Sequence, residues 1–254
     1  MILNFNKKFI FLSNPKCGST SIRGVLQRYN YAELTAAHLI EPLKETHKEY
    51  LANSESGAGP EEMPINLTNL MHITAHEMRT NLNLVPEPEC PAWEDFYTFS
   101  TVRNPWKRMV SYYFMSEPDK NWKTIFDDLE ERDVDSKFAP HFNDFCKWVI
   151  DEGRGLPSYE FFCCDWDTKE RIVDDVFKLE EIDDVFIETF KAKTGVELPF
   201  DKLPDLMADF KPADRSKFNK FKGNPYDLYN QETEALIAEV YKSDIEEFNY
   251  QFGQ

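Results

Sequence analysis

The chain begins with a short apolar segment that changes into a small, polar, glycine-bearing turn and then into a helical pattern. The run from Phe9 to Leu12 has the length and composition of a buried strand. After the turn, apolar residues recur at helical spacing, at Ile22, Val25, Leu26 and Tyr29. This pattern predicts a strand, a turn and a helix, whose N-cap would be one of the hydroxyl residues Ser19, Thr20 and Ser21.

A second junction of the same form is predicted further along the chain. The stretch "FYTFSTV", residues 96–102, has the aromatic and β-branched composition of a strand. It ends at "RNP", and Pro105 is well placed to be the first residue of a helix that runs through "WKRMVSYYF".

The later part of the chain continues the alternation of strand and helix signals. The segments "YEFFCCDW" and "DDVFKLEEI" look like further strands, or like a strand followed by a helix. Asn230 is a candidate N-cap for a helix with one broad apolar face that reaches Phe248. The alternation predicts an α/β fold with a parallel sheet covered by helices. No stretch reads as a convincing linker, so we predict one domain over residues 1–254.

Composition and charge narrow the classes of function. Hydrophobic residues make up 41% of the 254 residues and aromatic residues 15%, as in globular proteins. The net charge of -17 argues against nucleic acid or an anionic membrane as the main partner, because those partners require basic surfaces. No apolar run approaches the ~18 residues of a membrane span, and the N-terminus does not read as a signal peptide. We therefore expect a cytoplasmic protein whose five cysteines are reduced thiols.

The first turn has the composition of an anion site. A turn between a strand and a helix gathers backbone N–H groups at the positive end of the helix dipole. Gly18 would let the backbone approach a ligand, and Lys16 would add a positive charge. The Walker A pattern G-x-x-x-x-G-K-[ST] is absent, because this turn has one glycine and its lysine precedes it. The sequence therefore predicts a phosphate site of another kind.

The second junction carries a second candidate phosphate contact. Arg103 stands at the carboxyl end of the predicted strand, where its planar guanidinium can bind a phosphate dianion through two hydrogen bonds. Ser111 falls on the second turn of the predicted helix, where its hydroxyl can face the same anion. The alternative is that Arg103 and Arg108 are solvated or paired with local carboxylates, of which the chain has many.

Together the two motifs resemble those of sulfotransferases that use 3′-phosphoadenosine 5′-phosphosulfate (PAPS). The loop "PKCGSTS" is similar to the family's 5′-phosphosulfate loop, and "RNPWKRMVS" is similar to its second signature. The stretches "MHITAHEMR" and "ETEALIAEVYKSDIEEFNYQF" look like the branch that includes bacterial sulfotransferases and heparan and chondroitin O-sulfotransferases. This resemblance implies a P-loop-like, three-layer α/β fold with a central parallel β-sheet flanked by helices. It also implies PAPS as the donor, adenosine 3′,5′-bisphosphate (PAP) as the product, and no metal.

The resemblance implies roles for the residues of the first loop. Lys16 would bind the leaving 5′-phosphate and the bridging oxygen. The 5′ end of the nucleotide would be held, mainly through backbone N–H groups, by the residues Cys17, Gly18, Ser19, Thr20 and Ser21. Threonine is frequent in the family at the position of Cys17, and we interpret the cysteine as a packing choice.

The same resemblance implies which residues would bind the other end of the nucleotide, the 3′-phosphate. Arg103 and Ser111 would bind the 3′-phosphate, which distinguishes PAPS from ATP. A late basic segment that contains Arg215, Ser216 and Lys217 would close over the nucleotide.

The acceptor hydroxyl or amine needs a base, and histidine as a residue type titrates near neutral pH. His72 lies where related enzymes have a catalytic-looking histidine, and Glu77 is the alternative base. His76 would share a helical face with His72 if this stretch is helical. The excess of 46 acidic over 29 basic residues favours a neutral or cationic small acceptor, or a saccharide, over a heparin-like polyanion.

Two other classes of function stay open. A nucleotide kinase or other NTPase with an atypical loop is one, because Asp165 follows an apolar run and resembles a Mg²⁺-binding strand end. A non-catalytic module that keeps the nucleotide site for binding or assembly is the other. The joint presence of Lys16, Arg103, Ser111 and His72 weighs against the second alternative.

Overall fold

The computed structural model describes residues 1–4, 6–28, 72–83, 92–114, 134–198 and 224–254. The chain forms two compact units, which are treated separately below. The first contains Met1–Val102 and Glu160–Pro204, and the second contains Arg103–Tyr159 and Asp205–Gln254. The single domain expected from the sequence stays a prediction.

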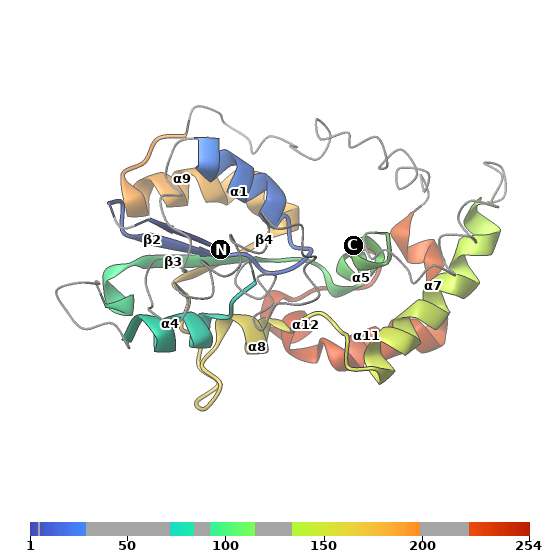
Figure 1. Cartoon of the computed structure of the whole chain (residues 1–254). Coiled ribbons are helices and arrows are strands. Elements are labelled where there is room, and N and C mark those ends of the chain that lie inside the picture. The colour runs from blue at the N-terminus through green and yellow to red at the C-terminus, as the bar shows by residue number, and fades with distance from the viewer. Residues whose placement is uncertain (5, 29–71, 84–91, 115–133, 199–223) are drawn as a thin grey trace, which may run out of the picture. The chain divides into compact units, whose positions relative to one another are not determined.

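The first unit is built on a four-stranded sheet in the order β1-β2-β3-β4 (Figure 1). Its strands are β1 (Ile2–Asn4), β2 (Phe9–Leu12), β3 (Tyr97–Val102) and β4 (Asp175–Lys178). β1 runs antiparallel to β2, whereas β2, β3 and β4 are parallel to one another. Their carboxyl ends therefore meet at one edge, where such sheets bind ligands. The predictions of β2 and β3 are confirmed, whereas the sequence reading missed β1.

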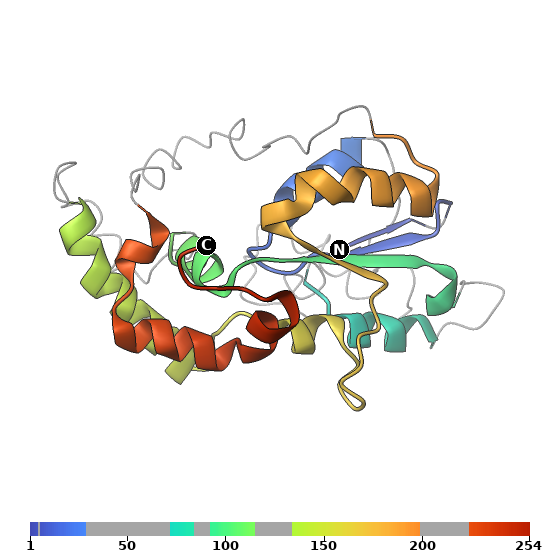
Figure 2. The ribbon, with the colours of Figure 1, turned by 180° about the vertical axis from the view of Figure 1, so that it is seen from behind.

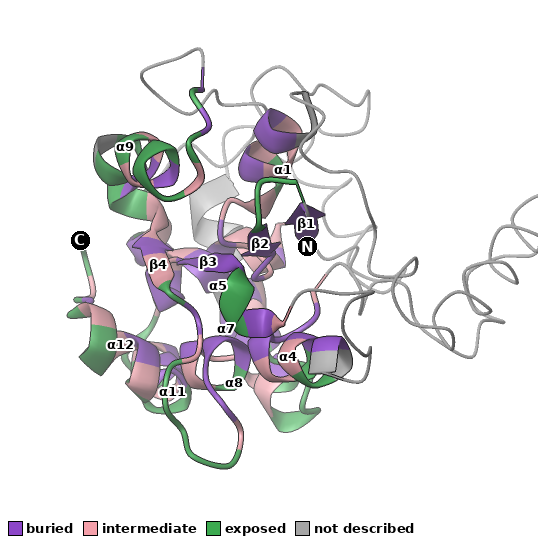
Figure 3. Ribbon diagram, turned by 90° about the vertical axis from the view of Figure 1, so that its left-hand side faces the viewer, coloured by how far each residue is buried: buried purple, intermediate pink, exposed green. Residues whose placement is uncertain are grey.

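Helices cover both faces of this sheet, which confirms the predicted three-layer α/β fold. α1 (Ser19–Arg28) and α9 (Ile182–Thr194) lie on one face, and α4 (Ala75–Asn83) lies on the other (Figures 1 and 3). Every residue of β2 and β3 is buried, as expected for parallel strands that are covered on both sides.

An aromatic core joins the sheet to α9. The ring centroid of Phe99 lies 5.6 Å from those of both Phe186 and Phe190, and Phe9 packs edge-on against Phe190 at 5.2 Å. Such ring pairs stabilise the packing beyond the area they bury. This core supports the strand ends from which the candidate site extends.

The segment "YEFFCCDW" is not a strand, which corrects the sequence reading. It forms the short helix α8 (Tyr159–Cys163) and the start of a turn. The segment "DDVFKLEEI" forms β4 followed by the 3₁₀ turn η4 (Leu179–Glu181), as one of the two predicted forms had it. Periodicity cannot distinguish a strand from a helix in so short an apolar run, which explains the error.

The described part of the second unit is helical. It contains α5 (Pro105–Tyr113), α7 (Val134–Asp151), η6 (Pro225–Leu228), α11 (Gln231–Val240) and α12 (Lys242–Phe248). Pro105 is the first residue of α5, and the side chain of Asn230 caps α11 by accepting from the Thr233 amide (2.9 Å), as predicted. No helix in the described ranges is both long and apolar enough to cross a membrane.

The single C-terminal helix expected from the apolar pattern is two helices, α11 and α12, at the red end of the chain in Figure 2. The break falls at Tyr241, whose backbone is at φ −107° and ψ 31°. Its buried phenol donates a hydrogen bond to the Leu156 carbonyl at 3.0 Å. The apolar pattern continues through the break because both helices bury the same side of the chain.

Candidate functional site

The turn that follows β2 is fastened to the neighbouring strand by side-chain hydrogen bonds. The Ser100 hydroxyl donates to the Leu12 carbonyl (2.8 Å), and the Thr101 hydroxyl donates to the Cys17 carbonyl (2.7 Å). Within the turn, the Cys17 amide donates to the Asn14 carbonyl (3.4 Å). Cys17 itself is fully buried, which agrees with its interpretation as a packing residue. Two side chains of β3 therefore hold the turn against the sheet.

Two residues of this turn have a left-handed backbone. Lys16 has φ 64° and Gly18 has φ 76°. A positive φ is uncommon for a residue with a side chain and is concentrated at functional sites. Turns that include left-handed residues can direct backbone N–H groups towards a bound anion. The turn conformation thus fits the predicted phosphate site.

Helix α1 begins immediately after the turn, and its N-cap is Gly18. The Gly18 carbonyl accepts the first helical hydrogen bonds, from the amides of Ser21 (3.1 Å) and Ile22 (3.4 Å). The predicted hydroxyl N-cap is therefore wrong, because Ser19, Thr20 and Ser21 all lie inside the helix. Glycine has no side chain with which to cap the first turn, and first-turn amides have no acceptor within their own helix. The amides of Ser19 and Thr20 lie in this turn, whereas the Ser21 amide already donates to Gly18.

Replacing Gly18 by alanine is expected to destabilise the first unit by more than the φ penalty of about 1–2 kcal/mol. The added Cβ would also collide with the Leu179 side chain of η4. Gly195 is the matched control for the φ penalty alone, because it has φ 68° and a Cβ added there would meet nothing within 4 Å. Urea unfolding of both alanine variants measures the difference, and equal losses would mean that Leu179 moves aside freely.

His72 reaches this turn from a distant part of the sequence. Its Nδ1 lies 2.5 Å from the Ser13 carbonyl oxygen. A carbonyl can only accept, so Nδ1 carries the proton, and in the neutral ring the lone pair is on Nε2. The ring is half-buried. The structure therefore brings together two predicted parts of the site, the phosphate turn and His72.

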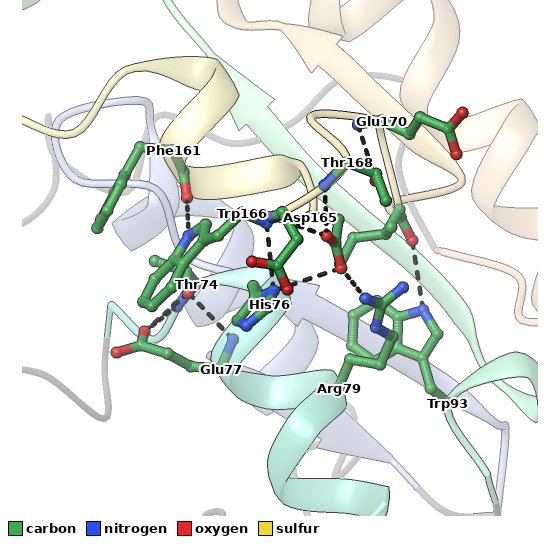
Figure 4. Close-up of polar contacts among 12 residues, drawn as sticks. Thr74, His76, Glu77, Arg79, Trp93, Phe161, Asp165, Trp166, Thr168 and Glu170 are labelled. Atoms are coloured by element: carbon green, nitrogen blue, oxygen red, sulfur yellow. Dashed lines mark hydrogen bonds and ion pairs between the residues drawn. The ribbon is translucent and has the colours of Figure 1, made fainter.

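The alternative base, Glu77, has a structural role at the start of α4 (Figure 4). Its carboxylate accepts from the Thr74 amide (2.9 Å) and hydroxyl (2.8 Å), and the Glu77 amide donates to the Thr74 hydroxyl (3.2 Å). This is a capping box, which fixes the helix N-terminus two residues after His72. The Thr-x-x-Glu spacing is the sequence signal that identifies it, and the sequence reading did not use it.

Asp165 does not end a strand, since it follows helix α8, and this removes the feature that resembled a Mg²⁺ site. Its Oδ1 accepts from the amides of Thr168 and Asp167, both at 2.9 Å, and its Oδ2 pairs with Arg79 (Figure 4). The Thr168 amide, with Asp167, Arg79 and His76, lowers the pKa of Asp165 to about 2. No group of three or more His, Cys, Asp or Glu side chains is placed to hold a metal within the described ranges.

The second junction begins at Arg103, the residue after β3. Asn104 is the N-cap of α5, and its side chain accepts from the amides of Trp106 (3.1 Å) and Lys107 (3.3 Å). The first turn of α5 is thus capped by a side chain, whereas the N-cap of α1 is a glycine. Arg103 and Ser111 are both half-buried and belong to the second unit. The other residues assigned to the nucleotide, Arg215, Ser216 and Lys217, lie outside the described residues.

Arg108, the other arginine of the second motif, is a structural residue. It is 2% exposed, and it donates to the Pro157 carbonyl at 2.8 Å. Its Nη1 lies 4.0 Å from Oδ1 of Asp244, a buried carboxylate that also accepts from the Tyr159 amide (2.8 Å). Burial raises the pKa of Asp244, and the neighbouring Arg108 opposes that rise. The motif therefore contains one buried arginine and one, Arg103, that remains partly exposed.

Comparison with known proteins identifies the family. The family described as "Sulfotransferase family" matches residues 1–251, which is nearly the whole chain. Searches of curated proteins and of solved structures gave no match. The match includes both strand-to-helix junctions and the segment that carries His72. The chain therefore belongs to the sulfotransferase family.

Proposed function

We propose that this chain transfers a sulfuryl group from PAPS to a hydroxyl or amine of an acceptor and releases PAP. The observation that carries the proposal is the position of His72, whose Nδ1 bonds the Ser13 carbonyl at the start of the phosphate turn. A base that one hydrogen bond holds beside an anion-binding turn suits sulfuryl transfer, because positioning and proton transfer both contribute to its rate.

The donor set of the turn suits the 5′ end of PAPS. Lys16 supplies a positive charge for the leaving phosphate, and the amides of Gly18, Ser19 and Thr20 supply neutral donors at the positive end of α1. Ser21 would contribute its hydroxyl, since its amide is used within the helix. When bound, PAPS supplies the activated sulfuryl group. The chain contributes donors that are fixed before charge develops on the leaving oxygen.

The 3′-phosphate is assigned to Arg103 and Ser111 on their motif. The arginine fork can donate two hydrogen bonds to a phosphate dianion, and the serine hydroxyl can donate a third. Arg215 and Lys217 are proposed to close over the nucleotide. This set would select PAPS over ATP, which lacks a 3′-phosphate.

His72 is proposed to take the acceptor's proton on Nε2. Because the Ser13 carbonyl holds the ring proton on Nδ1, the neutral ring has its lone pair on the other nitrogen. The new bond joins the acceptor oxygen or nitrogen to sulfur, while the bond from sulfur to the bridging oxygen breaks. The leaving oxygen keeps that electron pair, and Lys16 stabilises its negative charge.

The acceptor is proposed to be a neutral or cationic small molecule or a saccharide. The net charge of -17 would repel a heparin-like chain unless a local basic surface offset it. The test incubates the protein with radiolabelled PAPS and a panel of neutral saccharides, alkyl and aryl amines, phenols and heparin.

We expect label on a neutral or cationic member of the panel, and a loss of about 10²–10³-fold in the Lys16→Met variant. Exchange of an exposed lysine in the first unit, Lys169→Met, is the matched control and should leave transfer unchanged. Label on heparin alone would contradict the acceptor class. Binding of PAP with no transfer to any member would favour a non-catalytic module.

A further inference from the structure

The Asp165 carboxylate joins a surface turn to helix α4. Its Oδ1 accepts from two amides of its own turn, while its Oδ2 faces α4. There it forms an ion pair with Arg79 and lies 3.4 Å from Nδ1 of His76 (Figure 4). The side chain of Asp165 is only 7% exposed, whereas those of Arg79 and His76 are 28% and 21% exposed. One buried carboxylate therefore connects two segments that are distant in sequence.

The next residue of the turn strengthens this connection. The Trp166 amide donates to Nδ1 of His76 at 3.2 Å, and the two rings stack at 4.6 Å with an interplanar angle of 8°. Phe161 of α8 stacks on Trp166 at 5.0 Å. His76 and Arg79 are three residues apart, so they lie on the same face of α4. The turn therefore contacts one face of α4 at two residues, His76 and Arg79.

Helix α4 in turn determines where His72 lies. The capping box fixes the N-terminus of α4 at Thr74, and Ile73 and Ala75 are buried on either side of it. Only Ile73 separates His72 from the capping residue. His72 is consequently held at its ring by the Ser13 carbonyl and along its backbone by the start of α4. A shift of α4 would pull Nδ1 away from the carbonyl that orients the ring.

We propose that Asp165 is a positioning residue for sulfuryl transfer, which holds α4 through Arg79 and thereby keeps the His72 ring on Ser13. The inference rests on the proposed role of His72 as the base. Asp165 does not contact the base itself, so its effect must pass through α4. Its carboxylate stays ionised at neutral pH because backbone amides and Arg79 lower its pKa.

The test follows the tautomer of His72 by NMR in protein labelled with ¹⁵N-histidine, with the His72 signal identified by its absence in His72→Gln. Wild-type protein should show the ring proton on Nδ1. The variant Asp165→Asn keeps an oxygen for the two turn amides but removes the charge that pairs with Arg79. We expect it to lose the dominant Nδ1–H form while it keeps the wild-type dissociation constant for PAP.

Three further variants make the outcome decisive. Arg79→Gln should cause the same loss, and the double variant should add nothing to it, because both residues act through one contact. Asp167→Asn, which changes an exposed carboxylate in the same turn, should leave the His72 signal unchanged.

An unchanged tautomer in folded Asp165→Asn and Arg79→Gln would overturn the proposal. If Asp165→Asn does not fold, Arg79→Gln alone decides. Failure of wild-type protein to bind PAP would instead count against the proposed function, so the two failures are distinguishable.

Discussion

Replacement of His72 by alanine should lower sulfuryl transfer by about 10²–10⁴-fold, the usual contribution of a general base, and leave PAP affinity nearly unchanged. The expected split follows from geometry. The ring is oriented by the Ser13 carbonyl at the edge of the phosphate turn, whereas the proposed nucleotide donors are Lys16 and the amides of α1. Removing the ring takes away a proton acceptor but none of those donors.

The measurement is turnover of radiolabelled PAPS with an accepted member of the panel, together with calorimetric titration of PAP. His72→Gln refines the result, because a glutamine amide can still donate to the Ser13 carbonyl but cannot act as a base. It should be as inactive as the alanine variant. His141→Ala, on α7 in the second unit, is the control and should retain activity. Wild-type turnover in His72→Ala would remove His72 from the mechanism.

Replacement of Arg108 by methionine should lower the free energy of unfolding by about 3–5 kcal/mol, because it leaves the buried Asp244 carboxylate without a cation. Arg108 and Asp244 are 2% and 1% exposed, so water cannot take over the role of the guanidinium. The Pro157 carbonyl would also lose its donor. The effect should appear in urea unfolding as a lower midpoint.

The adjacent arginine of the same motif provides the comparison. Arg103→Gln removes a partly exposed charge, so it should cost clearly less stability than Arg108→Met, while it weakens PAP binding. The double variant Arg108→Met/Asp244→Asn should recover part of the lost stability, since no buried charge is left unpaired. Similar stabilities for Arg108→Met and Arg103→Gln would contradict the assignment of a structural role to Arg108 and a binding role to Arg103.

The sequence predicted the parts of the fold in which several local signals agree. The segment from Phe9 to Leu12 is short, apolar and followed by a glycine-bearing turn, and it forms strand β2 as the pattern predicted. Pro105 and Asn230 mark helix starts through backbone chemistry that acts over a few residues, so both were predicted correctly.

Apart from strand β1 and the local capping box of Thr74 and Glu77, the features that the sequence reading missed depend on contacts between distant segments. The Gly18 N-cap has a left-handed backbone in a turn whose Cys17 carbonyl accepts a bond from Thr101 of β3, and the break at Tyr241 accompanies a bond to Leu156. In the sequence, Asp165 resembled a metal ligand. Its actual partner, Arg79, is 86 residues away along the chain, so no local pattern could indicate the pair. The contact of His72 with Ser13 joins residues 59 apart, so the resemblance to the family pointed to His72 whereas local patterns did not.

The most direct test of the proposed function is calorimetric titration of the protein with PAP and, separately, with ATP, each with and without Mg²⁺. We predict tight binding of PAP that does not depend on Mg²⁺, and much weaker binding of ATP, because only PAP carries the 3′-phosphate assigned to Arg103 and Ser111. A preference for ATP with Mg²⁺ would contradict the proposed function and support the nucleotide kinase alternative.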